Sequence, residues 1–278
     1  MVFLGFKRLV AVIFMPLLLF ACEAPLEMGE VEKTQKEPIR RTDTLQDVVM
    51  LFDGSAIFVG GEGVVLEFSP NGEVIHRAQI GKVGAHPSLI DVTLCQDNSV
   101  FALSLDGVVW QRASQGRWQG RAVDTGETLQ AITCSPDGTL WLAASFSTLL
   151  KSQDKGGSWA EFSTYDDAFL TEISFVDEAV GFAIGEFSTM MKTVNGGDKW
   201  DNLNSTPYDF YPLSGYFLDA ETGWLGGLSG DIIKTSDGGQ TWTKEKVDSE
   251  APIYKIQKVG DDIFAIGNYG TLLTLSND

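Results

Sequence analysis

Residues 170–200 read LTEISFVDEAVGFAIGEFSTMMKTVNGGDKW, and this stretch holds the pattern that decides the fold. An alternating strand comes first, the short apolar segment GFAIGE follows, and STMMKT is a third strand that leads into a Gly-rich turn. Short apolar strands with Gly-rich turns between them, and no helical period, predict an antiparallel β-sheet.

The same unit recurs along the chain at roughly 40 to 45 residues, which is the length of one four-stranded propeller blade. Its third strands align without gaps and begin at Gly63, Gly107, Ser147, Ser188, Gly230 and Gly270. We therefore predict an all-β fold, a six-bladed β-propeller of four-stranded antiparallel blades over residues 46–278. The last repeat stops before its fourth strand. We expect residues near Pro38 to Thr44 to add this outer strand and close the ring.

Three repeats share the motif Ser/Thr-x-Asp/Asn-x-Gly-x-x-Trp directly after the third strand. The Asp or Asn side chain accepts hydrogen bonds within its own turn, Gly permits a positive φ, and Trp folds back onto the blade. We interpret these motifs as structural turns rather than catalytic acids, because hairpins at this place in a blade lie at the rim. The residues are Asp154, Gly156, Trp159, Asn195, Gly197, Trp200, Asp237, Gly239 and Trp242.

The first 45 residues differ in character from the repeats. Two basic residues precede an apolar run of about a dozen residues, and Leu-x-Ala then leads directly to Cys22. This order resembles a bacterial lipobox, so we predict a signal peptide over 1–21 and an acylated Cys22. The charged, Pro-containing stretch 22–45 reads as a flexible tether that ends in the closing strand. We expect the protein in the cell envelope, anchored to a lipid bilayer through Cys22, at the outer membrane facing the periplasm.

Charge narrows the range of partners. The chain has 20 basic and 38 acidic residues, a formal net charge of −18. Such a balance argues against nucleic acid, and against adhesion to anionic lipids through protein charge. It favours partners with basic or mixed surfaces.

Cys95 and Cys134 occupy what we take to be the same position of adjacent repeats. An oxidising compartment permits a disulfide between them. Equivalent positions on neighbouring inner strands are often too far apart for one, so we favour two small core residues.

Residues 169–200 and 211–242, which include FLTEISFVDEAVGFAIGEF and YPLSGYFLDAETGWLGGL, resemble the photosystem II stability and assembly factor family of Asp-box (BNR-type) propellers. The resemblance runs over residues 46–278. It implies a lumenal propeller, without a cofactor, that holds an assembly intermediate of a membrane protein complex. Known members have seven blades and an arginine patch, whereas this sequence has six repeats and few arginines. Genes for related lipoproteins lie beside exporter genes, so the resemblance also allows a role as an accessory protein of an envelope exporter.

A candidate partner-binding face follows from the loops that enter the first strand of each blade. In three consecutive repeats these loops are acidic and aromatic, which suits a basic or mixed protein surface. The alternative is that the rings cap the hub and the acids solvate it. The residues are Tyr165, Asp166, Asp167, Phe169, Tyr208, Asp209, Phe210, Tyr211 and Tyr254.

A glycoside hydrolase of the sialidase-like propeller type is the alternative function. Such an enzyme needs an arginine triad, a Tyr–Glu nucleophile pair and an acidic proton donor, and Pro38-Ile39-Arg40 has the reverse order of the expected Arg-Ile-Pro element. His76 and His86 have no partner at a recognisable catalytic spacing. The sequence also contains no metal-ligand motif. We therefore predict a protein that is not an enzyme and binds no metal or small-molecule cofactor.

Overall fold

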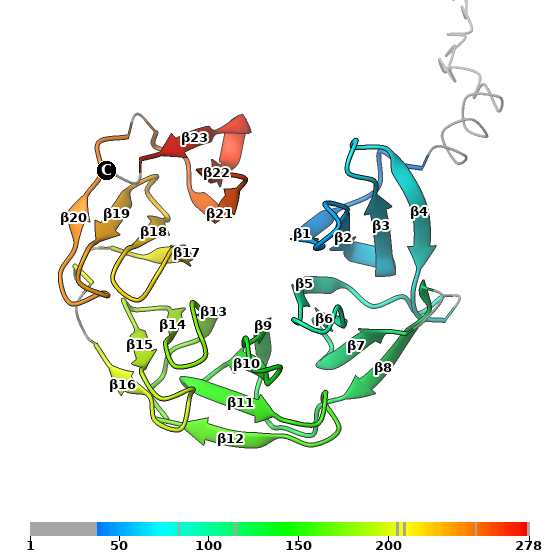
Figure 1. The fold of residues 1–278 in the computed structure, drawn as a ribbon, viewed down its shortest axis with the longest axis horizontal. Helices are drawn as coiled ribbons and strands as arrows, with labels where there is room; N and C mark the ends of the chain where they lie inside the picture. Colours follow the sequence, from blue (N-terminus) through cyan, green and yellow to red (C-terminus); the bar gives the residue numbers. More distant parts are fainter. Residues whose placement is uncertain are drawn as a thin grey trace, which may run out of the picture. The chain divides into compact units, whose positions relative to one another are not determined.

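The described part of the chain is a six-bladed β-propeller, as predicted. The computed structural model describes residues 38–276 except 83, 114–115, 204–205, 208–209 and 248. Residues 38–278 form one compact unit, in which the antiparallel sheets follow one another around a central axis (Figure 1). Within the described ranges, no helix has the length and apolar character that a membrane crossing requires. The predicted signal peptide and Cys22 lie outside the described residues.

The first strand of each blade lies nearest the axis and the last strand lies at the rim (Figure 1). Blades 1 to 3 consist of β1 (Leu45–Met50), β2 (Ala56–Gly60), β3 (Val64–Phe68) and β4 (Val74–Gln79); β5 (Leu89–Leu94), β6 (Val100–Ser104), β7 (Val108–Arg112) and β8 (Trp118–Ala122); β9 (Leu129–Cys134), β10 (Leu140–Ala144), β11 (Thr148–Ser152) and β12 (Ala160–Ser163). Blades 4 to 6 consist of β13 (Leu170–Phe175), β14 (Gly181–Gly185), β15 (Met190–Thr193) and β16 (Asp201–Asn202); β17 (Pro212–Phe217), β18 (Gly223–Gly227), β19 (Ile232–Thr235) and β20 (Thr243–Lys244); β21 (Ile253–Val259), β22 (Asp262–Gly267) and β23 (Leu272–Leu275). The single-turn 3₁₀ segments η1 (Gly61–Gly63) and η3 (Asn268–Gly270) form the hairpins between the second and third strands of blades 1 and 6.

The apolar core lies between the blades. Five buried clusters each join one blade to the next along the chain, from blade 1 to blade 6. Ile57 packs with Leu89 between blades 1 and 2, and Trp224 packs with Ile256 between blades 5 and 6. The second strands of blades 2 to 5 are buried on both faces because a neighbouring sheet covers each of them from either side.

The predicted closing strand is wrong. β21, β22 and β23 form a three-stranded sheet, and residues 38–44 contain no strand. Instead, this segment turns back on itself, because Asp43 accepts a hydrogen bond from the Arg40 N–H at 2.7 Å. Arg77 of β4 then pairs with Asp43 at 2.7 Å and donates to the Pro38 carbonyl at 2.9 Å. These contacts hold the segment on the outer strand of blade 1 rather than on blade 6.

The expectation that Cys95 and Cys134 are separate core residues is also wrong, since they form a disulfide with Cα atoms 5.2 Å apart. The two positions are not equivalent. Cys134 is the last residue of β9, whereas Cys95 follows the last residue of β5. Because successive strand residues point to opposite faces, this offset of one residue lets the two side chains face each other, and the bridge joins blades 2 and 3.

The three Asp-box motifs form the hairpins between third and fourth strands, away from the axis. In the last of them, Asp237 Oδ1 accepts the Gln240 and Thr241 N–H groups at 3.0 and 2.8 Å. Thr235 Oγ1 accepts the N–H of Gly239 at 2.9 Å, and Gly239 has a φ of 88°. The Thr241 hydroxyl and these N–H groups lower the pKa of Asp237 to about 2. The boxes of blades 3 and 4 make the same turn contacts.

Candidate functional site: the axial cavity and the crown face

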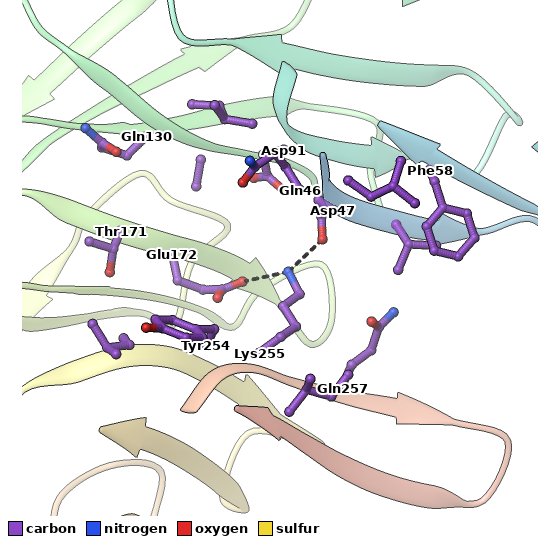
Figure 2. Close-up of a pocket in the computed structure, with 16 residues that line it drawn as sticks. Gln46, Asp47, Phe58, Asp91, Gln130, Thr171, Glu172, Tyr254, Lys255 and Gln257 are labelled. Carbon is purple, nitrogen blue, oxygen red and sulfur yellow. Dashed lines mark ion pairs between the residues drawn. The ribbon is translucent and has the colours of Figure 1, made fainter. Parts of the chain in front are cut away.

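Every inner strand carries a one-residue bulge at its second residue, and these bulges build a cavity on the axis. The strand pairing skips that residue in all six blades. The bulged side chains all line a cavity of 390 Å³, together with several residues that follow them (Figure 2). The six are Gln46, Ile90, Gln130, Thr171, Leu213 and Tyr254. A bulge re-aims side chains locally, which explains how an alternating strand directs two successive residues toward the axis.

The third residues of four inner strands form a charged group that we name the axial cluster: Asp47, Asp91, Glu172 and Lys255. Lys255 Nζ lies 3.2 Å from Asp47 and 4.0 Å from Glu172 (Figure 2). Burial and the neighbouring Asp47 raise the pKa of Asp91, and burial raises the pKa of Glu172. The charge of Glu172 raises the pKa of Lys255, so this lysine remains protonated.

The axial carboxylates also join neighbouring blades. Asp47 of β1 accepts a hydrogen bond from the Val92 N–H of β5 at 3.1 Å. Asp91 of β5 accepts the Ile132 N–H of β9 in the same way at 2.7 Å. A buried backbone N–H needs such a partner, so part of the role of these acids is structural.

We name the side of the propeller on which the inner strands begin the crown face. It carries the loops that enter the inner strands and, because neighbouring strands are antiparallel, the hairpins between second and third strands. The 390 Å³ cavity lies at this end of the axis, since the second residues of all six inner strands line it. A second cavity of 520 Å³ lies toward the strand ends, and the axial cluster lines both.

The structure separates the predicted partner-binding residues into two groups. Tyr165, Asp166, Asp167 and Tyr254 are exposed, and Tyr254 stands at the axial cavity. The others have intramolecular packing roles: Phe210 is buried in the core between blades 4 and 5, Phe169 is half-buried, and the Tyr211 hydroxyl bonds Glu186 at 2.8 Å. Tyr208 and Asp209 lie outside the described residues.

A larger set of exposed apolar side chains on the crown face was missed from the sequence. The hairpins between second and third strands of blades 2 to 6 each present one: Leu105, Phe146, Phe187, Leu228 and Tyr269. We name these five residues the crown. Tyr269 is 92% exposed and Phe187 is 72% exposed. The sequence signal was available, because each precedes by one or two residues the Gly or Ser at which the third strand is predicted to begin.

Three crown residues also have an unusual backbone conformation. Phe146, Phe187 and Tyr269 have φ values of 53°, 53° and 55°, and exposed Tyr165 has 57°. Bulky residues rarely adopt this left-handed region, where Gly or Asn is less costly. Glu62 has a φ of 55° at the equivalent hairpin of blade 1, so this conformation belongs to the hairpin, and the exposed rings are placed on it.

The described residues contain neither a metal-binding group nor a sialidase-type arginine triad at the axis. No group of three His, Cys, Asp or Glu residues among them is placed to hold a metal ion. His86 Nδ1 lies 2.9 Å from the Ile80 carbonyl, which is a loop contact. The arginines of the described ranges all lie within residues 40–121, and neither axial cavity has one in its lining. A sialidase-type arginine triad is therefore not present at the axis in the described part of the chain.

Comparison with known proteins finds sequence relatives among photosystem II assembly factors and one immune protein. No family model matches the chain. The photosystem II assembly lipoprotein Ycf48 of Synechococcus sp. (strain CC9902) is 27% identical over 96 residues, which are 34% of this chain and 29% of that protein. The immune protein Tsi7 of Pseudomonas aeruginosa is 29% identical over 147 residues, 52% of this chain and 44% of that protein. The chain thus matches less than half the length of either relative.

Solved structures share the fold. A streptogramin B lyase superposes with a TM-score of 0.71 at 11% identity, over 83% of this chain and 79% of the lyase. A structure of Ycf48 bound to a D1 peptide superposes with a TM-score of 0.51 at 15% identity, over 85% of this chain and 93% of that one. At such identities the likeness concerns architecture alone. With the sequence relatives, it confirms a β-propeller similar to photosystem II assembly factors.

Proposed function

We propose that this protein is a non-catalytic scaffold whose crown face binds an integral membrane or envelope protein complex. The observation that carries the proposal is the crown itself, five exposed apolar side chains on one face of the ring. Exposed apolar side chains that recur at the same hairpin of five blades suit an interaction surface better than singly scattered ones would. The similarity to Ycf48, and the structure of Ycf48 with a D1 peptide, support a partner that belongs to a membrane complex.

The role that fits this proposal is that of an assembly or accessory factor. It has two forms: assistance to photosystem II assembly, as the name of the relative indicates, or to an envelope exporter. An acyl chain on Cys22 would hold the propeller at a periplasmic membrane surface, where either complex would be within reach. Photosystem or exporter genes beside the coding gene would distinguish the two.

The test is capture of a complex from detergent-solubilised membranes of the source organism. The triple variant Phe146→Asn, Phe187→Asn and Tyr269→Asn removes three rings and keeps a residue that tolerates the left-handed backbone. We expect capture to fall at least about tenfold, since aromatic residues dominate many interfaces. Phe52→Asn is the matched control, because Phe52 is 62% exposed and lies between β1 and β2, at the opposite end of the inner strand. Equal capture by the triple variant and the wild type would refute the proposal.

A glycoside hydrolase is the second candidate, because Tyr211 and Glu186 form the kind of Tyr–Glu pair that sialidases use. Burial and Glu186 raise the pKa of Tyr211, however, and a nucleophilic tyrosine needs the opposite shift. Hydrolysis of a fluorogenic sialoside that disappears in Tyr211→Phe would favour the enzyme over the scaffold.

A further inference from the structure

The axial cavity has an unbalanced set of charges. Three acidic side chains of the axial cluster face one ammonium group, that of Lys255, and a second cation would favour the charged forms of Asp91 and Glu172, whose pKa values are raised by burial. The polar groups around them are uncharged, and Tyr254, at the cavity, is 54% exposed. Figure 2 shows Gln46, Gln130 and Thr171 among the side chains that line this cavity together with the axial cluster. The cavity therefore offers hydrogen-bond acceptors and a negative field to a group that enters from the crown face.

The cavity and the crown lie on the same face, which links them to one occupant. The volume of the axial cavity, 390 Å³, falls at the small end of the range for ligand pockets, about 300–1,000 Å³. A cavity of this size suits a single long side chain rather than a folded element. Apolar side chains surround the face, and exposed Asp166 and Asp167 add negative charge to it. An apolar segment with one basic residue would match all of these features.

We propose that the axial cavity receives a lysine or arginine side chain from the partner, while apolar residues on either side of it lie on the crown. This inference rests on the proposed function and names the chemistry of its partner. The incoming cation donates charge-assisted hydrogen bonds to Glu172 and Asp47. It adds a second positive charge to a cavity in which Lys255 alone faces three acidic side chains. Tyr254 lies beside its alkyl stem.

Charge argues against other occupants of the same face. Anionic lipid would meet a protein of net charge −18 and an acidic cavity. A second copy of the chain would bring the same negative face toward itself. A basic segment of a different protein has neither problem.

The test uses three capped tripeptides that contain leucine, a central residue and leucine, with lysine, norleucine or glutamate at the centre. Titration of the full chain is followed by isothermal calorimetry or NMR. We expect the lysine peptide to bind at least about tenfold more tightly than the norleucine peptide, as one charged hydrogen bond would provide. The glutamate peptide should bind least. Equal affinities of the lysine and norleucine peptides would overturn the inference.

Two variants assign the preference to the cavity. Glu172→Gln keeps an acceptor but removes the charge, and should reduce the preference for lysine about fivefold to tenfold. Gln130→Lys supplies an amine from the chain itself, and should abolish the preference. Glu161→Gln is the control, because Glu161 is exposed on the rim strand β12. An unchanged preference in Gln130→Lys overturns the inference even if Glu172→Gln fails to fold.

The two proposals fail in different ways. If the crown variant loses capture of the complex but the peptides show no lysine preference, the scaffold stands and the cavity inference is wrong. If the crown variant retains capture, the proposed function is wrong whatever the peptides do. Binding to phosphatidylglycerol vesicles, or a dimer in sedimentation, that depends on the crown would overturn both.

Discussion

Reduction of the Cys95–Cys134 disulfide should destabilise the propeller strongly. The two cysteines are 39 residues apart in sequence, and a cross-link of that span removes loop entropy from the unfolded chain worth about 4 kcal/mol at 25 °C. The Cα separation of 5.2 Å is ordinary for a disulfide, so the folded state offsets little of this gain. We expect the free energy of unfolding to fall by about 3–4 kcal/mol on reduction.

Urea unfolding, followed by tryptophan fluorescence with and without reductant, measures this effect. The midpoint should move by roughly 1–2 M urea for a chain of this size. The double variant Cys95→Ala and Cys134→Ala is the control, because its midpoint should not respond to reductant. Alkylation of both thiols in the unreduced native protein would refute the bridge, and an oxidised midpoint equal to the reduced one would refute the entropic reasoning.

The remaining predictions concern the turns, the axis and the anchor. Asp237→Ala should lower the free energy of unfolding by about 1–2 kcal/mol, through lost turn hydrogen bonds, while Asp237→Asn should cost less because the amide oxygen still accepts. The pKa of Asp237 lies near 2, below its usual value, so its stabilising effect is complete above about pH 4 and is lost as the pH falls through about 2; thermal melts at pH 5 to 2 should be flatter for Asp237→Ala. Lys255→Met leaves Asp47 and Glu172 without their ion pair and should cost about 1–2 kcal/mol at pH 7, since the Lys255 side chain is 35% exposed and solvent screens the pair. Part of the lost stability should return at pH 5, because burial raises the pKa of Glu172 and its protonation removes the unpaired charge. A free energy of unfolding of the variant that falls further on acidification would contradict this. Cys22→Ala should release the protein from the membrane fraction, and unchanged fractionation would exclude the lipid anchor.

Local sequence was sufficient for the blades. A strand shows its buried faces through the spacing of its own apolar residues, and an Asp-box turn is held by bonds among residues at most four apart, such as Asp237 and Thr241. Both depend on short-range geometry that repeats with the sequence. The exposure of Tyr165 and Asp166 followed in the same way from their place in a polar loop.

Contacts between blades depended on the tertiary structure. The burial of Phe210, the offset that joins Cys95 to Cys134 and the meeting of Lys255 with Asp47 all involve different blades. The shift of one residue at each bulge, and the packing of one sheet on the next, set which of these side chains meet. The sequence by itself determined the repeat, the strands and their turns. Only the arrangement of the sheets around the axis decided the axial cluster and the common face of the crown, because these residues belong to different repeats that lie about 40 or more residues apart.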